Sequence, residues 1–518
     1  MRQGTDTCPV VSQKLFRDFR EVLEYFETHG RLMRIKQEVG LDDYKISSAV
    51  RSASDTDGPA FLFENIKGCP GWRIAAGVYA NRRNVALSLG IEEKELRTFF
   101  LERMLSRIPP RRVSCGPVKE VILKGEEVNL LALPIPVHAE LDRGHLINGY
   151  VSGDLLIGRV PDTSMCETAM VRMTPLSLNT ISVWRGGGHL RQLMNEAEAK
   201  GKGMELAAVI GFEPSFAYAS QLFNPMGTLD ELELCGGFRG GPVELVKCET
   251  IDVEVPANSE IVLEMVCIPG ERVSDGPYGE FHGTYGGSPA VAVAKVTAIT
   301  MRRDPIYCTV MTGVPPTENH WIKGPGREAM AWANAKRTGV DVVDVYLPPG
   351  GAYVNQAIIS IRKRHEEDPR VVMMAMLSSG RGVNAVTRVT VVDDDIDVRD
   401  PKDVDWAIMN RCEPDLDVII IPGYQSYEEA RQQHSTGIVR PGVRGAKWGI
   451  DATAPLKGKW AYQKVYVPGQ AQIDWRKGEQ MWDGVDLKPR PSGPEVIPER
   501  HQGAKPETVD LQPVRRKK

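Results

Sequence analysis

The sequence predicts a mixed α/β (α+β) protein with a small N-terminal α/β lobe, a β-rich central region and a second α/β domain. Three observations predict this order. The 518 residues exceed what a single core usually serves, since domains typically contain roughly 100–200 residues. Polar and apolar residues broadly alternate between Glu120 and about Ile299, which is typical of strands. After Gly324, strand and helix patterns alternate instead.

The N-terminal lobe is expected over residues 1–112 and opens with an amphipathic helix. Its apolar residues recur at helical spacing, and a glycine suited to end the helix follows at Gly30. The residues of this stripe are Phe16, Phe19, Val22, Leu23 and Phe26. Short apolar runs at 60–63 and 72–77 predict strands. The lobe is expected to end near Pro109 and Pro110.

The central region, residues 113–312, should be dominated by strands and could close into a barrel. Residues 151–158 and 251–255 show the alternation that predicts strands. A helix is expected at residues 189–200, where Ala, Glu and Lys are good helix formers. A barrel mouth beside this helix would suit a cofactor.

A linker helix region is expected at residues 313–335, and the C-terminal α/β domain at residues 336–482. The patterns predict a helix over 327–338. They also predict buried strands at 371–377 and 386–392. Alternation of strand and helix is what defines an α/β domain.

The last part of the chain predicts one more helix and then a tail. Asp400 and Pro401 are suited to cap and begin a helix that carries Trp406. Residues 483–518 are rich in proline and charge and end in Arg-Arg-Lys-Lys. We expect them to form an extended or disordered tail.

Composition and charge exclude several classes of function. Lys and Arg total 64 against 68 Asp and Glu, so the formal net charge of -4 offers no broad basic surface to nucleic acid. The longest purely apolar runs are strand-length, below the ~20 residues of a membrane span. The first residues lack the apolar region of a secretory signal, which predicts a cytoplasmic protein. The nine cysteines stand singly, so they are expected to be reduced thiols.

The most unusual local sequence is residues 274–283, where a Gly-Pro-Tyr-Gly turn stands between Asp275 and Glu280. Proline and glycine at these positions fit a tight reversal that can hold the two carboxylates together. One carboxylate could then stay ionised while its neighbour is kept protonated as a general acid. Two solvated acids beside a surface turn are the alternative.

Two basic side chains are further candidates. Arg172 follows an apolar run on an expected strand, where its planar fork could bind a substrate carboxylate or pair with one of the two acids. An exposed strand arginine is the alternative. His189 follows three glycines at an expected helix start, which suits a phosphate or a metal ligand, although a lone histidine is usually structural. The common hydrolase, metalloprotease and dinucleotide motifs are absent in a convincing context.

Taken together, these segments resemble the UbiD decarboxylase family from about residue 16 to about residue 455. The opening elements at 17–20 and 61–68 match less specifically. The most specific matches, in chain order, are residues 246–256, 275–283, 393–397 and 449–453. Ordered motifs of this length seldom coincide by chance.

The resemblance implies a central split β-barrel that binds flavin and a C-terminal α/β domain that forms the oligomer. It also implies a catalytic set of Arg172, Asp275 and Glu280, in which Asp275 stands where the family has glutamate. Glu280 would be the proton donor, while Arg172 and Asp275 would orient substrate and cofactor. The shorter aspartate matters because a shift of one carbon can disturb the reacting geometry.

The cofactor that the resemblance implies is prenylated FMN, with a divalent metal, usually Mn²⁺, and K⁺ as an optional further ion. The metal would lie between the cofactor phosphate and three side chains, Glu167, His189 and Glu231. Glu167 replaces the asparagine of the family and adds negative charge beside the phosphate. The positions that match cofactor contacts are Met170, Val171, Arg172, Gly188, His189, Glu231 and Lys447.

The function that the resemblance implies is reversible, non-oxidative decarboxylation of an aromatic or α,β-unsaturated carboxylic acid. One alternative is a physiological carboxylase of an aromatic ring. Another is a catalytically inactive flavin-binding homologue. Only Glu167 and Asp275, which differ from the family's residues at these positions, favour it. The implied partners are a flavin prenyltransferase that supplies the cofactor and further copies of the chain, in a homodimer or a higher homo-oligomer.

Overall fold

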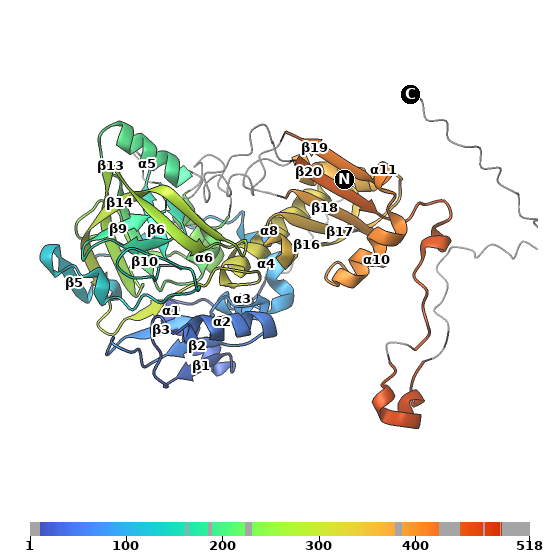
Figure 1. Ribbon diagram of the computed structural model, residues 1–518, viewed down its shortest axis with the longest axis horizontal. Helices are drawn as coiled ribbons and strands as arrows, with labels where there is room; N and C mark the ends of the chain where they lie inside the picture. The colour runs from blue at the N-terminus through green and yellow to red at the C-terminus, as the bar shows by residue number, and fades with distance from the viewer. Residues whose placement is uncertain are drawn as a thin grey trace, which may run out of the picture. The chain divides into compact units, whose positions relative to one another are not determined.

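The computed structural model describes residues 11–160, 163, 165–184, 189–222, 230–378, 386–423, 446–469, 472–486 and 488. Two compact units divide the chain at Ala452 and Thr453. Within the first unit the elements follow the expected order, an N-terminal α/β lobe, a strand-rich centre and a second α/β domain (Figure 1).

The first helix, α1 (Phe19–Thr28), confirms the predicted amphipathic helix. Asp18 caps it, because its carboxylate accepts a hydrogen bond of 3.0 Å from the backbone N–H of Glu21. The helix ends before Gly30, whose φ of 64° is a conformation that glycine adopts without strain. The residues that α1 buries are Phe19, Val22, Leu23 and Phe26.

The sheet of the N-terminal lobe includes one strand from far along the chain. Its order is β1 (Leu32–Ile35), β2 (Ala60–Phe63), β3 (Arg73–Ala76) and β15 (Ile306–Cys308). β2 and β3 confirm the two predicted strands, and β15 pairs with β3 in parallel. Helices α2 (Lys45–Thr56) and α3 (Arg82–Ser88) lie with α1 in the same lobe (Figure 1, blue).

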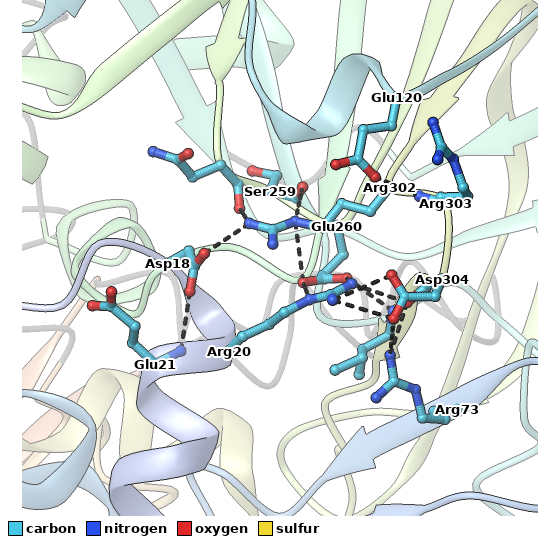
Figure 2. Close-up of polar contacts among 12 residues, drawn as sticks. Asp18, Arg20, Glu21, Arg73, Glu120, Ser259, Glu260, Arg302, Arg303 and Asp304 are labelled. Atoms are coloured by element: carbon cyan, nitrogen blue, oxygen red, sulfur yellow. Dashed lines mark hydrogen bonds and ion pairs between the residues drawn. The ribbon is translucent and has the colours of Figure 1, made fainter.

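A network of charged side chains joins α1 to the central strands. Arg20 donates two hydrogen bonds of 2.8 Å to the carboxylate of Glu260, which is fully buried. Arg302 donates to the capping residue Asp18 at 2.9 Å and lies 3.4 Å from Glu260. Figure 2 shows the Arg20 guanidinium between Glu260 and Asp304. Paired charges of opposite sign therefore connect the lobe to the centre.

The centre contains one large antiparallel sheet. Its strands, in sheet order, are β7 (Cys166–Ala169), β6 (Leu155–Arg159), β10 (Glu205–Ile210), β13 (Ile261–Gly279), β14 (Tyr285–Met301), β9 (Thr180–Val183) and β8 (Met173–Pro175). β5 (Val121–Lys124) also pairs with β14. Among the described residues no strand pairing joins β8 back to β7, so no closed barrel is present there, whereas the resemblance implied a split β-barrel. Register shifts between β13 and β14 mark bulges, which bend paired strands.

Two strands predicted in the centre are shorter than their patterns indicated. β6 begins only at Leu155, while Val151 makes an isolated bridge with Met173. The stretch at 251–255 yields only β12 (Glu254–Pro256), which forms a small sheet with β11 (Glu244–Lys247) and β4 (Arg111–Arg112).

Among the described residues, four α-helices follow α3 in the chain, before and among the central strands. The predicted helix after the three glycines is confirmed as α5 (His189–Ala199). The other helices are α4 (Leu96–Arg103), α6 (Ser215–Ala219) and α7 (Glu231–Arg239). Short 3-10 helices lie at Glu93–Glu95, Pro117–Lys119, Gly125–Glu127 and Leu130–Ala132.

Helix α8 (Glu318–Lys336) begins earlier than the predicted helix over 327–338. A capping box between Thr317 and His320 starts it, and the helix then continues through Gly324, Pro325 and Gly326. A side chain at Gly324 would lie within 3.0 Å of Tyr353, so the small residues allow close packing. Gly324 is therefore a packing position inside the helix.

The C-terminal domain contains a five-stranded sheet with an apolar cluster on each face. The strand order is β16 (Asp341–Tyr346), β17 (Gln356–Arg362), β18 (Arg388–Asp393), β20 (Ala446–Ala452) and β19 (Val418–Pro422). Neighbouring residues of β17 enter different clusters, Ile359 on one face and Ile358 on the other. β18 confirms the predicted strand at 386–392.

The prediction of a strand at 371–377 is wrong, because these residues lie in α9 (Asp368–Ser378). Val372 and Met376 are buried one helical turn apart, whereas Val371 and Met374 are exposed. A short apolar run cannot be assigned to strand or helix by its length alone. Helix α10 (Pro401–Arg411) confirms the prediction at Asp400 and Pro401, and α11 (Pro414–Asp417) follows.

The second unit has little regular structure in its described residues. It contains the 3-10 helices η7 (Lys459–Tyr462) and η8 (Trp475–Trp482). Most of the predicted tail at 483–518 lies outside the described residues. In the part of the chain that the structure describes, no helix is both long enough and apolar enough to cross a membrane, and the cysteines form no disulfide with one another.

Candidate active site

Arg172 holds both acidic residues of the predicted set. Its Nε and Nη2 atoms donate hydrogen bonds of 2.9 and 2.7 Å to the same oxygen of Asp275, Oδ2. Its Nη1 atom donates to Oε1 of Glu280 at 2.6 Å. The structure therefore brings Arg172 together with two acids that lie more than 100 positions further along the chain.

The three side chains are withdrawn from water to different degrees. The exposed fraction of the side chain is 4% for Arg172, 1% for Asp275 and 19% for Glu280. Burial alone would lower the pKa of Arg172, but the charges of Glu280 and Asp275 outweigh it and raise the pKa. The guanidinium is therefore firmly charged, and the alternative of two solvated acids on a surface turn does not hold.

Local structure explains why these residues meet. Arg172 lies in the connection between β7 and β8, whereas we had expected it on a strand. Asp275 lies on β13, and Glu280 comes directly after that strand ends at Gly279. The bulged end of β13 therefore presents both carboxylates to one guanidinium.

Two aromatic rings enclose the guanidinium. The Arg172 carbon Cζ lies 4.2 Å from the ring centre of Trp184 and 4.7 Å from that of Tyr278. Such cation–π contacts hold the plane of the guanidinium and exclude water. Nothing in the sequence pattern indicated Trp184, because a contact across two strands leaves no local signal.

Asp142 is a buried acid that the sequence did not indicate. Its Oδ1 accepts from the N–H of Gly279 at 2.8 Å, and its Oδ2 accepts from the N–H of Ala139 at 3.0 Å. Burial raises the pKa of Asp142 to about 6, against the opposing effect of these backbone N–H groups. Asp142 thus fixes the peptide that joins Tyr278 to Gly279, the residue before Glu280.

The three predicted metal ligands lie in one neighbourhood. Nδ1 of His189 is 2.7 Å from Oε1 of Glu167. Glu231 accepts from the N–H and the hydroxyl of Thr168, at 2.6 and 2.5 Å, and Thr168 is the residue after Glu167. Burial raises the pKa of Glu167, and His189 opposes this rise. Within the described ranges, however, no three His, Cys, Asp or Glu side chains converge as a preformed metal site.

The remaining predicted cofactor contacts are distributed over two domains. Met170 and Val171 are half-buried in the same connection as Arg172. Lys447 lies on β20, where its ammonium donates to the carbonyl of Leu377 at 2.7 Å and burial lowers its pKa. Gly188 lies outside the described residues.

Comparison with known families identifies the chain. Residues 23–104, 111–315 and 320–452 match the N-terminal, the Rift-related and the C-terminal domains of 3-octaprenyl-4-hydroxybenzoate carboxy-lyase. The chain belongs to the UbiD family.

Known proteins of this kind are similar over nearly their whole length. An uncharacterized protein of Archaeoglobus fulgidus is 30% identical over 502 residues, which cover 91% of this chain and 98% of that protein. The UbiD-class enzyme HmfF of Pelotomaculum thermopropionicum, in an evolved dimeric form with prFMN, is 32% identical, with a TM-score of 0.76 over 89% of this chain and 100% of that one. Vanillic acid decarboxylase of Sedimentibacter hydroxybenzoicus is 28% identical, with a TM-score of 0.74 over 88% of this chain and 95% of that one.

Proposed function

We propose that this chain catalyses the reversible, non-oxidative decarboxylation of an aromatic or α,β-unsaturated carboxylic acid with prenylated FMN and a divalent metal. The observation that carries the proposal is the buried clamp in which Arg172 holds Asp275 and Glu280. Membership of the UbiD family and the likeness to HmfF with prFMN support it.

The side chains at the three predicted metal positions carry donor atoms that suit a divalent metal, although they do not converge on one point in the described structure. Glu167, His189 and Glu231 offer carboxylate oxygens and an imidazole nitrogen, which are donors that Mn²⁺ accepts. We propose that they hold the metal, and that Met170, Val171, Arg172, Gly188 and Lys447 contact the cofactor. When bound, prenylated FMN supplies the electron-accepting ring system for the charge that remains as carbon dioxide leaves.

The three residues of the clamp have different roles in the proposed reaction. Arg172 carries a fixed positive charge, and its fork is suited to orient a substrate carboxylate beside the two acids. Asp275 is almost fully buried, so it holds the fork in one orientation. Glu280 keeps 19% of its side chain exposed, and only its Oε1 is bound by Arg172. We propose that Glu280 delivers a proton to the substrate carbon that lost its carboxylate.

The test is to co-express the chain with a flavin prenyltransferase, purify it without oxygen, and measure the bound cofactor by mass and absorbance. Aromatic and acrylic acids are then screened for carbon dioxide release. The Glu280→Gln variant should keep the cofactor and lose turnover, whereas Glu271→Gln, an exposed residue on β13, should behave like the natural chain. Turnover in Glu280→Gln would contradict the role of Glu280.

Two outcomes would replace the proposal. Folded protein with metal but without flavin would remove the cofactor chemistry altogether. Protein with bound cofactor but without turnover of any acid would favour the inactive flavin-binding homologue. We also propose a homodimer or larger assembly, since the HmfF structure is described as an evolved dimeric form.

A further inference from the structure

We infer that His320 is a positioning residue for Glu280, acting through the backbone carbonyl of Phe281. Phe281 is the residue bonded directly to Glu280, and Nε2 of His320 contacts its carbonyl oxygen. His320 lies on α8 and Glu280 after β13, so the contact joins two separate elements. The kinetic part of this inference rests on the proposed function, but its spectroscopic part does not.

The start of α8 fixes the tautomer of His320. Its Nδ1 accepts a hydrogen bond of 2.9 Å from the backbone N–H of Thr317. A neutral imidazole that accepts at Nδ1 carries its proton on Nε2, so Nε2 is the donor to Phe281. The ring is fully buried, and burial lowers the pKa of His320 to about 4, which keeps it neutral.

Further contacts hold the peptides on both sides of Glu280. The hydroxyl of Thr312 donates to the carbonyl of Gly279 at 2.5 Å, and Asp142 accepts from the N–H of the same residue. The ammonium of Lys323 lies 4.4 Å from the ring centre of Phe281. His320 is therefore one member of a set that grips residues 279 and 281.

The backbone of Glu280 itself is closed into a tight turn. Its N–H donates to the carbonyl of Thr284 at 2.9 Å, and its carbonyl accepts from the N–H of Gly283 at 2.9 Å. A methyl group at Gly286 would lie 2.7 Å from Cγ of Glu280, so the Glu280 side chain packs into the space that this glycine leaves. With the backbone held, the hydrogen bond to Phe281 sets where the Glu280 carboxylate meets Arg172.

Two amide substitutions separate the two functions of the imidazole. Asparagine places an acceptor near the Nδ1 position and nothing at the Nε2 position, so His320→Asn keeps the helix cap and loses the donor. Glutamine reaches the Nε2 position, so His320→Gln keeps the donor. Thr317→Ala is the control for the cap, because it removes only the hydroxyl that lies 2.8 Å from Nδ1.

The infrared part of the experiment uses the full chain as purified, and the kinetic part uses protein loaded with cofactor. Infrared titration of the Glu280 carboxyl band, assigned with Glu280→Gln, should show a changed midpoint in His320→Asn and an unchanged midpoint in His320→Gln and Thr317→Ala. With an acid that the natural chain turns over, His320→Asn should lower kcat at least about 10-fold with KM within about 2-fold, as expected when only reacting geometry is disturbed.

The inference is overturned if His320→Asn leaves the Glu280 band unchanged. It is also overturned if the Asn and Gln variants change that band equally, since the donor would then be irrelevant. Because the infrared measurement needs no turnover, it decides the positioning role even if no acid is decarboxylated. Absence of turnover in the natural chain would count against the proposed function alone.

Discussion

Arg172 directs two of its nitrogen atoms to a single oxygen of Asp275 and leaves the third for Glu280. Both bonds to Asp275 therefore restrict the rotation of the fork, while Glu280 is held by one bond only. A buried cation between two carboxylates also satisfies charges that would be costly to bury alone.

Replacing Arg172 by lysine should abolish most of the turnover while the protein stays folded. Lysine keeps the positive charge but lacks the planar fork that binds both acids. We expect kcat to fall at least about 100-fold, measured as carbon dioxide release from a substrate of the natural chain. Arg272→Lys is the control, because Arg272 on β13 pairs with Glu198 of α5 through a half-buried contact. Equal losses in both variants would contradict a special role of the Arg172 fork.

Replacing Arg20 by methionine should destabilise the protein by about 3 kcal/mol, since it leaves the buried carboxylate of Glu260 without its main partner. The measurement is urea denaturation of the natural protein and of the Arg20→Met variant at pH 7. Arg17→Met is the control, because 65% of the Arg17 side chain is exposed. A loss no larger than that of the control would show that Arg302 and the N–H of Ile306 suffice for Glu260.

Replacing Asp154 by asparagine should stabilise the protein, and more so at higher pH. Asp154 is fully buried, neither oxygen has a hydrogen-bond partner among the described residues, and burial raises its pKa far above the usual value. A carboxyl with a raised pKa in the folded state binds more protons there than when unfolded, so its contribution to stability falls as pH rises above about 4.

The difference in unfolding free energy between Asp154→Asn and the natural chain should therefore grow from pH 4 to pH 8. Its slope should not exceed about 1.4 kcal/mol per pH unit, the value for one proton. Asp415→Asn, at an exposed position on α11, should give no such slope. A difference independent of pH would show that Asp154 is ionised in the folded protein.

His138 should make the protein sensitive to acid. Its ring is buried between the hydroxyls of Thr309, at 2.7 Å, and Ser47, at 3.1 Å, and burial lowers its pKa to about 4. A histidine with a lowered pKa is protonated first in the unfolded state, so stability is lost as pH falls from about 6.5 to about 4.

The pH dependence of urea unfolding checks this expectation. His138→Gln should make the unfolding free energy depend less steeply on pH between pH 6.5 and pH 4. The slope should fall by no more than the value for one bound proton. His29→Gln, at an exposed position, should leave the slope as it is. An identical slope in the natural chain and in His138→Gln would mean that other buried groups cause the loss.

Local signals predicted the elements that depend on local chemistry. The stripe of α1 and the cap at Asp400 could be read from a few neighbouring residues, and both are confirmed. The strand expected at 371–377 is a helix, because a short apolar run satisfies either period. The helix predicted over 327–338 begins at Glu318 instead, and Gly324 and Gly326 lie where α8 packs closely against neighbouring side chains.

The candidate site was predictable only in part. Arg172, Asp275 and Glu280 could be named from the resemblance, and the structure brings them together. Trp184, Asp142 and His320 could not, because each acts through a contact made by folding rather than through its neighbours in the chain. Whether Glu167, His189 and Glu231 bind a metal stays a prediction.

The strand β15 limits how the protein can be cut into fragments that fold by themselves. It supplies the fourth strand of the N-terminal sheet from residues 306–308, about two hundred positions beyond that lobe. A fragment that stops at residue 112 would leave the edge of β3 open to pairing with other chains. During synthesis, the sheet of the N-terminal lobe can likewise be completed only after residues 306–308 have been made. The N-terminal lobe is thus not a module that could be exchanged between proteins by itself.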